Sequence, residues 1–353
     1  MAMTVRICCS VLRRVGAALA LGVSGLVLAV AGASAQGEVN IYSYREPQLI
    51  EPLLKGFTEL TGMRTNVVYA SAGLNERLAA EGQNSPADLL FTVDAGRLSE
   101  AKEAGLTQAV DLVSLQQAIP SQYRDPGNHW FGLTMRSRIV YASKARVKQD
   151  SITYEELADP KWKGKICSRS GQHTYNVALV AAMIANHGEA KAEQWLRGVK
   201  ANLARKPSGG DREAVRDVAA GLCDLAIGNT YYMAAMLHNP EQKAWADAVH
   251  IIFPNAGDRG THVNISGAAL AAHSPNKAEA VKLMEFLASP PAQKLYAEIN
   301  GEYPVIAGAE ASDLVRGWGA LKPDSLPLAR IGELRKAASE MVDRVKFDSG
   351  AGS

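Results

Sequence analysis

The sequence predicts an α/β protein of two lobes, each built on a doubly wound parallel sheet, with a hinged cleft between the lobes. Short apolar runs alternate with helix-like stretches along most of the chain. Two strand-rich segments, one over 128–147 and one after residue 261, interrupt this alternation and predict two extended crossings between two βα sets. A chain of 353 residues with 47% hydrophobic residues is long enough for two domains of ordinary size.

The first βα set precedes the first crossing. Its predicted strand–helix pairs are EVNIYSY with REPQLIEPLLKGFTELTG (38–62) and ADLLFTV with DAGRLSEAKEAG (87–105). Gly62 and Gly105 stand where the two helices are expected to end, since glycine adopts the left-handed conformation of a helix C-terminus. Asp94 follows the second strand and is expected to be the N-cap of the next helix rather than a metal ligand.

The second βα set lies between the two crossings. Its predicted pairs are KGKICSRS with TYNVALVAAMIANHG (163–188) and CDLAIGN with TYYMAAMLHN (223–239). Gly188 stands at the expected end of the first of these helices. Because ligands of doubly wound sheets bind where strands pass into helices, both strand–helix junctions are candidate sites.

The two crossings predict how the chain divides into lobes. We expect residues 36–136 plus about 261–311 to form the N-terminal lobe and about 137–260 plus 312–353 to form the C-terminal lobe.

The first 35 residues are typical of a cleaved secretory signal peptide. They combine Arg6, Arg13 and Arg14 with an apolar stretch from Val15 and a small-residue ending at Ala35. Removing them takes away three basic residues and no acidic one, so the formal net charge changes from +2 to −1. That balance does not favour binding to nucleic acid or to an anionic membrane surface.

Two cysteines, Cys167 and Cys223, remain after the signal peptide. An oxidising compartment allows them to form a disulfide. They are equally compatible with two small buried hydrophobic residues, and sequence spacing does not decide between the alternatives. No apolar run after the signal peptide approaches the roughly 18 residues of a membrane span.

A pair of tyrosines marks the second candidate junction. Asn229 and Thr230 are good N-cap residues, so Tyr231 and Tyr232 are expected in the first turn of a helix. This end of a helix favours negative charge, which makes a phenolate more favourable there than elsewhere. Tyr175 opens the other helix in the same way, and three phenols are expected to converge at one sheet edge.

Three converging phenols favour a hard, highly charged cation. Free tyrosine titrates near pH 10 and requires a strong cation to lose its proton at neutral pH. Ferric iron meets both requirements, whereas zinc and copper(I) favour imidazole and thiolate donors. Three phenolates would neutralise Fe³⁺ and leave coordination positions open for an external anion.

The end of the first strand supplies a candidate anion site on the opposite lobe. Arg45 carries a guanidinium suited to a two-oxygen contact with carbonate or bicarbonate. Tyr44 and Glu46 flank it and are possible additional metal ligands. Arg136 and Arg138, near the first crossing, are expected either to add positive charge around the anion or to bridge the lobes.

Taken together, these segments resemble the periplasmic ferric-iron-binding proteins of bacterial ABC importers, the so-called bacterial transferrins. The resemblance spans the chain after the signal peptide, and it is carried by NIYSYREPQLIEPLLKGF, NSPADLLFTVDAGRL, WFGLTMRSR, KWKGKICSRSGQHTYNVALVAAMI, ANLARKPSGGDRE, IGNTYYMAAML, FPNAGDRGTHVNISGAALAAHSPNKAEAVKLMEFL and VKFD. It implies the two-lobe periplasmic binding protein fold with class II-like doubly wound sheets. It also implies a monomeric periplasmic receptor that delivers iron to a membrane permease and its ATPase.

The resemblance also implies a role for individual residues. Tyr175, Tyr231 and Tyr232 match the iron ligands of the family, and Arg45 matches the arginine that helps to hold a synergistic carbonate. Members with this first strand commonly continue with glutamine, whereas this chain has Glu46. The extra carboxylate is expected either to weaken carbonate binding or to replace carbonate as a ligand. A histidine ligand is not expected, and His173 is expected to be a loop residue.

Two other functions compete with the ferric-iron receptor. The first is a receptor for an organic anion or a polyamine that uses the tyrosines as walls of the same cleft. The second is an enzyme, but the sequence has no G-x-S-x-G, H-E-x-x-H, C-x-x-C or G-x-G-x-x-G motif. We therefore expect a binding protein rather than a catalyst.

Overall fold

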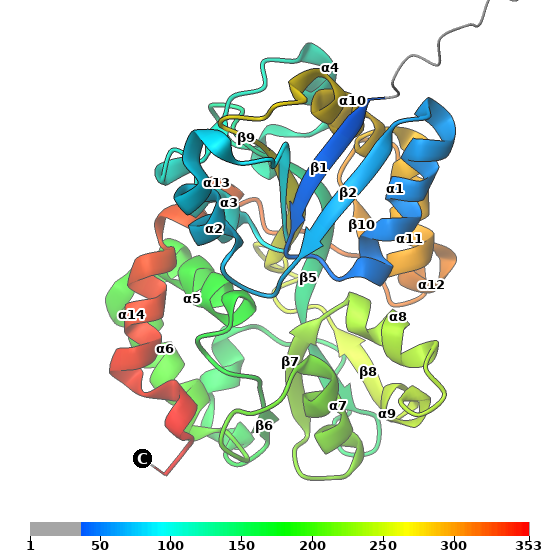
Figure 1. The fold of residues 1–353 in the computed structure, drawn as a ribbon. Helices are drawn as coiled ribbons and strands as arrows, with labels where there is room; N and C mark the ends of the chain where they lie inside the picture. The colour runs from blue at the N-terminus through cyan, green and yellow to red at the C-terminus, as the bar shows by residue number, and fades with distance from the viewer. Residues whose placement is uncertain (1–36, 353) are drawn as a thin grey trace, which may run out of the picture. The chain divides into compact units, whose positions relative to one another are not determined.

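The computed structural model describes residues 37–352 (Figure 1). The predicted signal peptide, residues 1–35, lies outside the described residues. Within the described part of the chain, no helix is both long enough and apolar enough to span a membrane.

The first sheet combines parallel strands with antiparallel crossings. Strand β1 (Glu38–Ser43) pairs in parallel with β2 (Arg64–Tyr69) and β3 (Leu89–Thr92). Strand β9 (Val263–Ala271) pairs antiparallel with β3 and with the first part of β5 (Phe131–Ser143). The short strands β4 (Thr107–Gln108) and β10 (Tyr303–Pro304) extend its edges.

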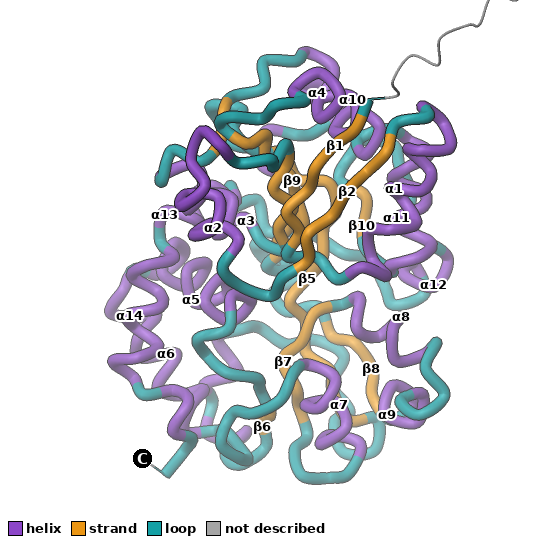
Figure 2. Tube along the Cα trace, viewed as in Figure 1, coloured by secondary structure: helices purple, strands orange, loops and turns teal. Residues whose placement is uncertain are grey.

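The second sheet begins on the same strand β5. The residues of β5 up to Ser137 pair with β9, and those from Arg138 onward pair with β7 (Leu225–Asn229) and β8 (Val249–Ile252). Strand β6 (Ile166–Cys167) is parallel to β7. Figure 2 shows β5 running from one group of strands into the other.

The strands of the βα units pair in parallel as predicted, but β5 and β9 are antiparallel to their neighbours, so both sheets are mixed. The parallel pairing agrees with the long connections of the βα units. Both predicted strand-rich segments, over 128–147 and after residue 261, are confirmed as β5 and β9. Strand β5 pairs with strands of both sheets, whereas β9 pairs with strands of the first sheet.

Helices cover the first sheet on both faces. In Figure 1, α1 and α11 lie on one side of it and α2 and α3 on the other. The helices that accompany this sheet are α1 (Pro47–Thr61), α2 (Leu74–Glu81), α3 (Ala95–Glu103), α4 (Val113–Ala118), α10 (Lys277–Leu287) and α11 (Pro290–Asn300). Gly62 ends α1 in the left-handed conformation, with φ of 74°, and Asp94 caps α3, both as predicted.

Helices also cover both faces of the second sheet. Its helices are α5 (Thr174–His187), α6 (Glu189–Ala201), α7 (Asp211–Ala219), α8 (Tyr231–Leu237) and α9 (Lys243–Asp247). Val140 and Ile227 contribute to the core that includes α5, whereas Tyr141 and Ala226 contribute to the core that includes α7 and α8. This period-two alternation buries both faces, as expected for doubly wound sheets.

The last part of the chain contacts helices of both sheets. Helix α13 (Leu328–Glu333) packs against α3 and α5, and α14 (Arg335–Val345) packs against α5 and α6. Helix α12 (Asp313–Arg316) precedes them. The short 3₁₀ turns are η1 (Gly82–Asn84), η2 (Ser121–Tyr123), η3 (Glu155–Ala158), η4 (Pro160–Trp162) and η5 (Phe347–Ser349).

The two cysteines form a disulfide, which decides the alternative left open by the sequence. Cys167 in β6 and Cys223, two residues before β7, have Cα atoms 5.9 Å apart and are 56 residues apart in sequence. Both are buried. The bond therefore closes a loop that includes α5, α6 and α7 within the second sheet's core.

Removing this disulfide is expected to destabilise the protein. The chain-entropy relation for a loop of this length gives about 4 kcal/mol in the free energy of unfolding for the double variant Cys167→Ala, Cys223→Ala. Urea denaturation of the variant and of the reduced and oxidised parent protein measures the effect. The reduced parent should match the variant, and equal stability of the variant and the oxidised parent would contradict the expectation.

Candidate metal centre

The tyrosine pair begins a helix at the end of strand β7. Helix α8 starts at Tyr231 with Thr230 as its N-cap, so Tyr231 and Tyr232 occupy the first two helical positions, as predicted. The hydroxyl of Thr230 accepts a hydrogen bond from the backbone N–H of Ser137 in β5. This hydrogen bond connects the start of α8 to strand β5.

The third tyrosine begins helix α5 with a cap that the sequence analysis did not predict. The N-cap is His173, whose ring Nδ1 accepts a hydrogen bond from the backbone N–H of Tyr175 at 3.3 Å. Its ring packs edge-on against Tyr175, with the ring centroids 4.5 Å apart. Burial, followed by the charge of Arg169, lowers the pKa of His173 to about 3. His173 is therefore neutral and positions Tyr175.

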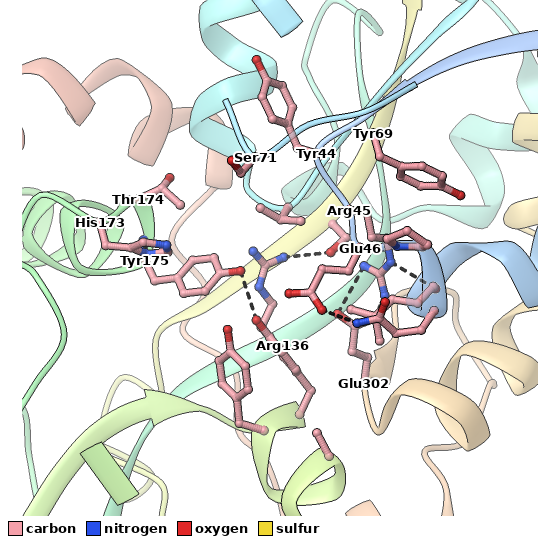
Figure 3. Close-up of a pocket in the computed structure, with 18 of the residues that line it drawn as sticks. Tyr44, Arg45, Glu46, Tyr69, Ser71, Arg136, His173, Thr174, Tyr175 and Glu302 are labelled. Carbon is pink, nitrogen blue, oxygen red and sulfur yellow. Dashed lines mark hydrogen bonds and ion pairs between the residues drawn. The ribbon is translucent and has the colours of Figure 1, made fainter. Parts of the chain in front are cut away.

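The three tyrosines converge on one cavity. The hydroxyls of Tyr175 and Tyr231 are 3.0 Å apart, and the ring centroids of Tyr231 and Tyr232 are 4.3 Å apart. All three line a cavity of about 450 Å³ between the two sheets' helices, together with residues of the loop after β1. Figure 3 shows Tyr175 and Arg136 directed into this region.

Burial keeps two of the phenols protonated when no cation is present. Desolvation raises the pKa of Tyr231 well above its ordinary value, and neighbouring Tyr175 and Tyr232 raise it further. The pKa of Tyr232 is also raised, first by burial and then by Tyr175. The expectation that the helix N-terminus favours a phenolate is thus outweighed by desolvation. A cation that binds here must displace these protons.

Three arginines surround the ring of Tyr175. The guanidinium carbons of Arg136, Arg138 and Arg169 lie 5.4, 5.9 and 5.3 Å from its centroid. Their positive charge would attract a phenolate formed at Tyr175. Arg169, which follows β6, was not identified from the sequence, because an isolated arginine in a loop is more often a surface residue.

Arg138 is a buried arginine whose two terminal nitrogens are paired within the protein. It pairs with Asp211 at 2.5 Å, and it donates hydrogen bonds to Asn176 at 2.7 Å and to Asn229 at 3.1 Å. Asp211 also accepts from the backbone N–H of Asn229 and lies 3.5 Å from Arg169. Arg138 was expected either to add charge around an anion or to bridge the lobes. Its partners Asp211, Asn176 and Asn229 all lie within 137–260, the expected C-terminal lobe, so these contacts do not bridge the lobes.

Arg45 lines the cavity, but its charge is already paired. Its guanidinium forms a buried ion pair with Glu302, and its Nε donates to the carbonyl of Leu49. Figure 3 shows this pair at the wall of the cavity. Glu302 was not identified from the sequence, since it lies 257 residues from Arg45 and no local pattern connects them.

Arg136 is the buried arginine without an acidic partner. Its Nη1 donates to the hydroxyl of Ser266, and no carboxylate among the described residues forms an ion pair with it. Arg212 also lines the cavity, 5.9 Å from the ring of Tyr232. Arg136 was predicted to supply charge to an anion site, and this arrangement leaves it available for that role.

Tyr44 and Glu46, the two additional candidate ligands that follow β1, have different surroundings. The hydroxyl of Tyr44 accepts a hydrogen bond from the backbone N–H of Asn75 at 2.8 Å, and Arg97 covers its ring. Figure 3 shows the Tyr44 ring pointing away from Tyr175. Glu46 is exposed, lines the cavity and accepts a hydrogen bond from Gln48.

The donors of this centre differ from the usual protein metal ligands. Across residues 37–352, no group of three or more His, Cys, Asp and Glu side chains is arranged to hold a metal ion. Five tyrosines, including Tyr175, Tyr231 and Tyr232, instead line the cavity together with the exposed Glu46. Arg136 and Arg212 also line it, and neither forms an ion pair with a carboxylate of the described residues.

Comparisons with known proteins agree with this fold. The profile of the family described as bacterial extracellular solute-binding protein matches residues 84–318. The iron uptake protein A1 of Synechocystis sp. is 42% identical over 312 residues, which is 87% of each chain. A crystal structure of ferric iron-binding protein A of Mannheimia haemolytica, in an open conformation, has 51% identity and a TM-score of 0.84 over 88% of this chain and 99% of that one. A structure from Trichodesmium (IdiA, FutA) in complex with iron and citrate ligands has 42% identity and a TM-score of 0.84, covering 88% of this chain and 100% of that one.

The ion pair between Arg138 and Asp211 is expected to be essential for stability. Burial opposes ionisation of Asp211, but Arg138 and Arg169 outweigh it and hold its pKa below the ordinary value of 3.8. Asp211→Asn leaves both arginines without their countercharge and should lower the free energy of unfolding by about 3 kcal/mol at neutral pH. The stabilisation is present above about pH 4 and is lost as the pH falls through the lowered pKa of the folded state.

Denaturation curves at several pH values check this expectation. Asp313→Asn is the matched control, because Asp313 pairs with Arg316 on the surface and exposed pairs contribute little. The difference between parent and Asp211→Asn should narrow in acid. A constant difference, or one no larger than that of the control, would contradict the assignment.

Proposed function

Because the chain belongs to the family of bacterial extracellular solute-binding proteins, we propose that it is a ferric-iron receptor with Tyr175, Tyr231 and Tyr232 as phenolate ligands. One observation carries the proposal: the three phenols, from the first turns of two different helices, meet in one cavity with the hydroxyls of Tyr175 and Tyr231 3.0 Å apart. The iron-related names of the Synechocystis, Mannheimia and Trichodesmium proteins support it.

The chemistry of the phenols suits ferric iron. Phenolate oxygen is a hard anionic donor, and three of them balance the charge of Fe³⁺. The raised pKa values of Tyr231 and Tyr232 mean that binding releases protons, so iron affinity increases with pH. Protonation would favour release, and burial contributes by making the protonated phenols more stable in the metal-free protein.

An external anion completes the coordination of iron, and Arg136 holds it. Arg136 is buried, lines the cavity beside Tyr175 and has no carboxylate partner among the described residues, whereas Arg45 is neutralised by Glu302. A guanidinium suits a carbonate or carboxylate group. The Trichodesmium complex contains citrate, which supports a carboxylate anion as an alternative to carbonate.

Closure of two lobes around the metal provides the signal for transport. The N-terminal lobe comprises residues 36–136 plus about 261–311, and the C-terminal lobe about 137–260 plus 312–353. The change of pairing partner within β5, between Ser137 and Arg138, supports a hinge at the first crossing. The closed form delivers iron to an inner-membrane ABC permease and its ATPase.

The remaining features follow from this role. Residues 1–35 direct export as a signal peptide and are then cleaved. The mature protein acts in the periplasm as a monomer. It is a receptor rather than an enzyme, and the family and the names of its relatives support this.

Replacing a ligand tyrosine should abolish tight iron binding. Tyr231→Phe and Tyr232→Phe each remove one anionic donor, and we expect a loss of at least about 100-fold in ferric affinity, since even residues that only orient a ligand contribute 10–100-fold. The readouts are competition with a ferric chelator and the phenolate-to-iron charge-transfer band of the stripped and reloaded protein.

The controls for this experiment line the same cavity. Tyr69→Phe removes a phenol whose hydroxyl donates to Glu51, and it should leave the band and the affinity unchanged. Tyr44→Phe tests the additional candidate ligand and should have the same small effect. Full affinity in both Tyr231→Phe and Tyr232→Phe, or no band in the parent, would refute ferric ligation and favour an organic ligand.

Iron binding should depend on the anion and on Arg136. Loading in bicarbonate, in citrate and without either is expected to change the position and strength of the charge-transfer band. Arg136→Lys keeps the charge but loses the planar two-donor fork, so this anion dependence should weaken. Arg97→Lys, at the opposite wall over Tyr44, is the control and should retain it. A band indifferent to both anions would instead favour Glu46 as the fourth ligand.

A further inference from the structure

A second, much smaller cavity adjoins Tyr175 where the crossing strands meet. It is lined by Arg136, Arg138, Tyr175, Asn229, His262 and Asn264. Its volume of about 10 Å³ has room for one water-sized species. Arg136 and Asn264 are paired in the first sheet and Arg138 and Asn229 in the second, so the cavity joins the two sheets.

Several residues that line this cavity carry a nitrogen donor without a protein acceptor. Four buried nitrogens of its lining residues have no hydrogen-bond partner among the described residues: Arg136 Nη2, Arg138 Nε, Asn229 Nδ2 and Asn264 Nδ2. The four side chains are each at least nine-tenths buried. Unpaired buried donors are costly, so four around one cavity indicate an acceptor that binds between them.

The orientation of both asparagines is determined by their other contacts. Asn264 Oδ1 accepts from the backbone N–H groups of Ala95 and Ile265, and Asn229 Oδ1 accepts from Arg138 Nη1. The amide nitrogens are therefore the groups left without a partner, and exchanging oxygen and nitrogen would break these bonds.

The charges around the cavity are also unbalanced. Arg136, Arg138 and Arg169 surround Tyr175, and Asp211 is the one carboxylate that pairs with members of this group among the described residues. Two positive charges are left in a buried region. A buried charge is stable when an opposite charge lies close to it.

We propose that this small cavity binds a single monatomic halide ion, which is chloride under ordinary conditions. One halide ion accepts several N–H donors at once and supplies negative charge, whereas a water molecule accepts two hydrogen bonds and leaves the charge unchanged. The volume excludes carbonate, phosphate and citrate, so this position differs from the anion position in the large cavity, although Arg136 lines both cavities. The proposal rests on the donors and charges of this cavity and holds whether or not the protein binds iron.

Bound halide would connect the two sheets at the crossing. Its donors come from β5, from the end of β7 and from the start of β9, and all of them lie in or beside the hinge region. The ion would stabilise the packing of these three strands and offset the arginine charge that Asp211 leaves unbalanced.

Diffraction from crystals of the metal-free protein tests the site directly. Crystals grown in bromide, and in chloride with data collected at long wavelength, should show an anomalous peak within hydrogen-bonding distance of Arg136 Nη2 and Arg138 Nε. A density without anomalous signal in both salts would identify water and overturn the proposal.

Thermal unfolding tests the same site in solution. At constant ionic strength, replacing gluconate by chloride or bromide should raise the melting temperature by about 2 °C at ten times the dissociation constant, and the increase should continue with the logarithm of the halide concentration. Asn264→Asp keeps the oxygen that accepts from Ala95 and Ile265 and places a negative oxygen where the amide nitrogen was. It should remove both the halide dependence and the anomalous peak.

The matched control has the same change of charge away from the cavity. Asn239 Oδ1 accepts from the backbone N–H of Glu241, so Asn239→Asp keeps its local bond and should retain the full halide effect. An equal halide effect in Asn264→Asp and Asn239→Asp would overturn the proposal. Absence of a halide effect in the parent protein would do the same.

Discussion

The buried ion pair between Arg138 and Asp211 is the interaction on which the site depends. Asp211, the first residue of α7, pairs with Arg138 of β5 and accepts from the backbone N–H of Asn229 at the end of β7. Arg138 also holds Asn176, beside Tyr175. One carboxylate thus positions the strand that leads into α8 and, through Arg138, the first turn of α5. The phenols meet because both helix starts are fixed to this pair.

Burial imposes a second constraint on the same region. Desolvation raises the pKa of Tyr231 and Tyr232, although the helix N-terminus by itself favours negative charge. The arginines around Tyr175 supply more positive charge than Asp211 neutralises. Burial therefore favours the protonated phenols of Tyr231 and Tyr232 in the metal-free protein, in a region where positive charge exceeds negative charge.

Residues far apart in sequence account for the differences between expectation and structure. Arg45 was expected to hold an anion, but Glu302, 257 residues away, pairs with it in the folded protein. The sheets are mixed rather than parallel because β5 and β9 run antiparallel to neighbouring strands. None of these contacts leaves a periodic or local signal in the sequence.

The sequence by itself determined the alternation of strands and helices, the two crossings and the placement of Tyr231 and Tyr232 at a helix start. Those features depend on local periodicity and capping, which act over a few residues. Only the tertiary structure decided that Tyr175 lies 3.0 Å from Tyr231, that the cysteines bond, and that Arg136 rather than Arg45 has no acidic partner among the described residues. Such contacts depend on strand order and on which buried charges become neighbours, and both are set by the packing of the whole chain.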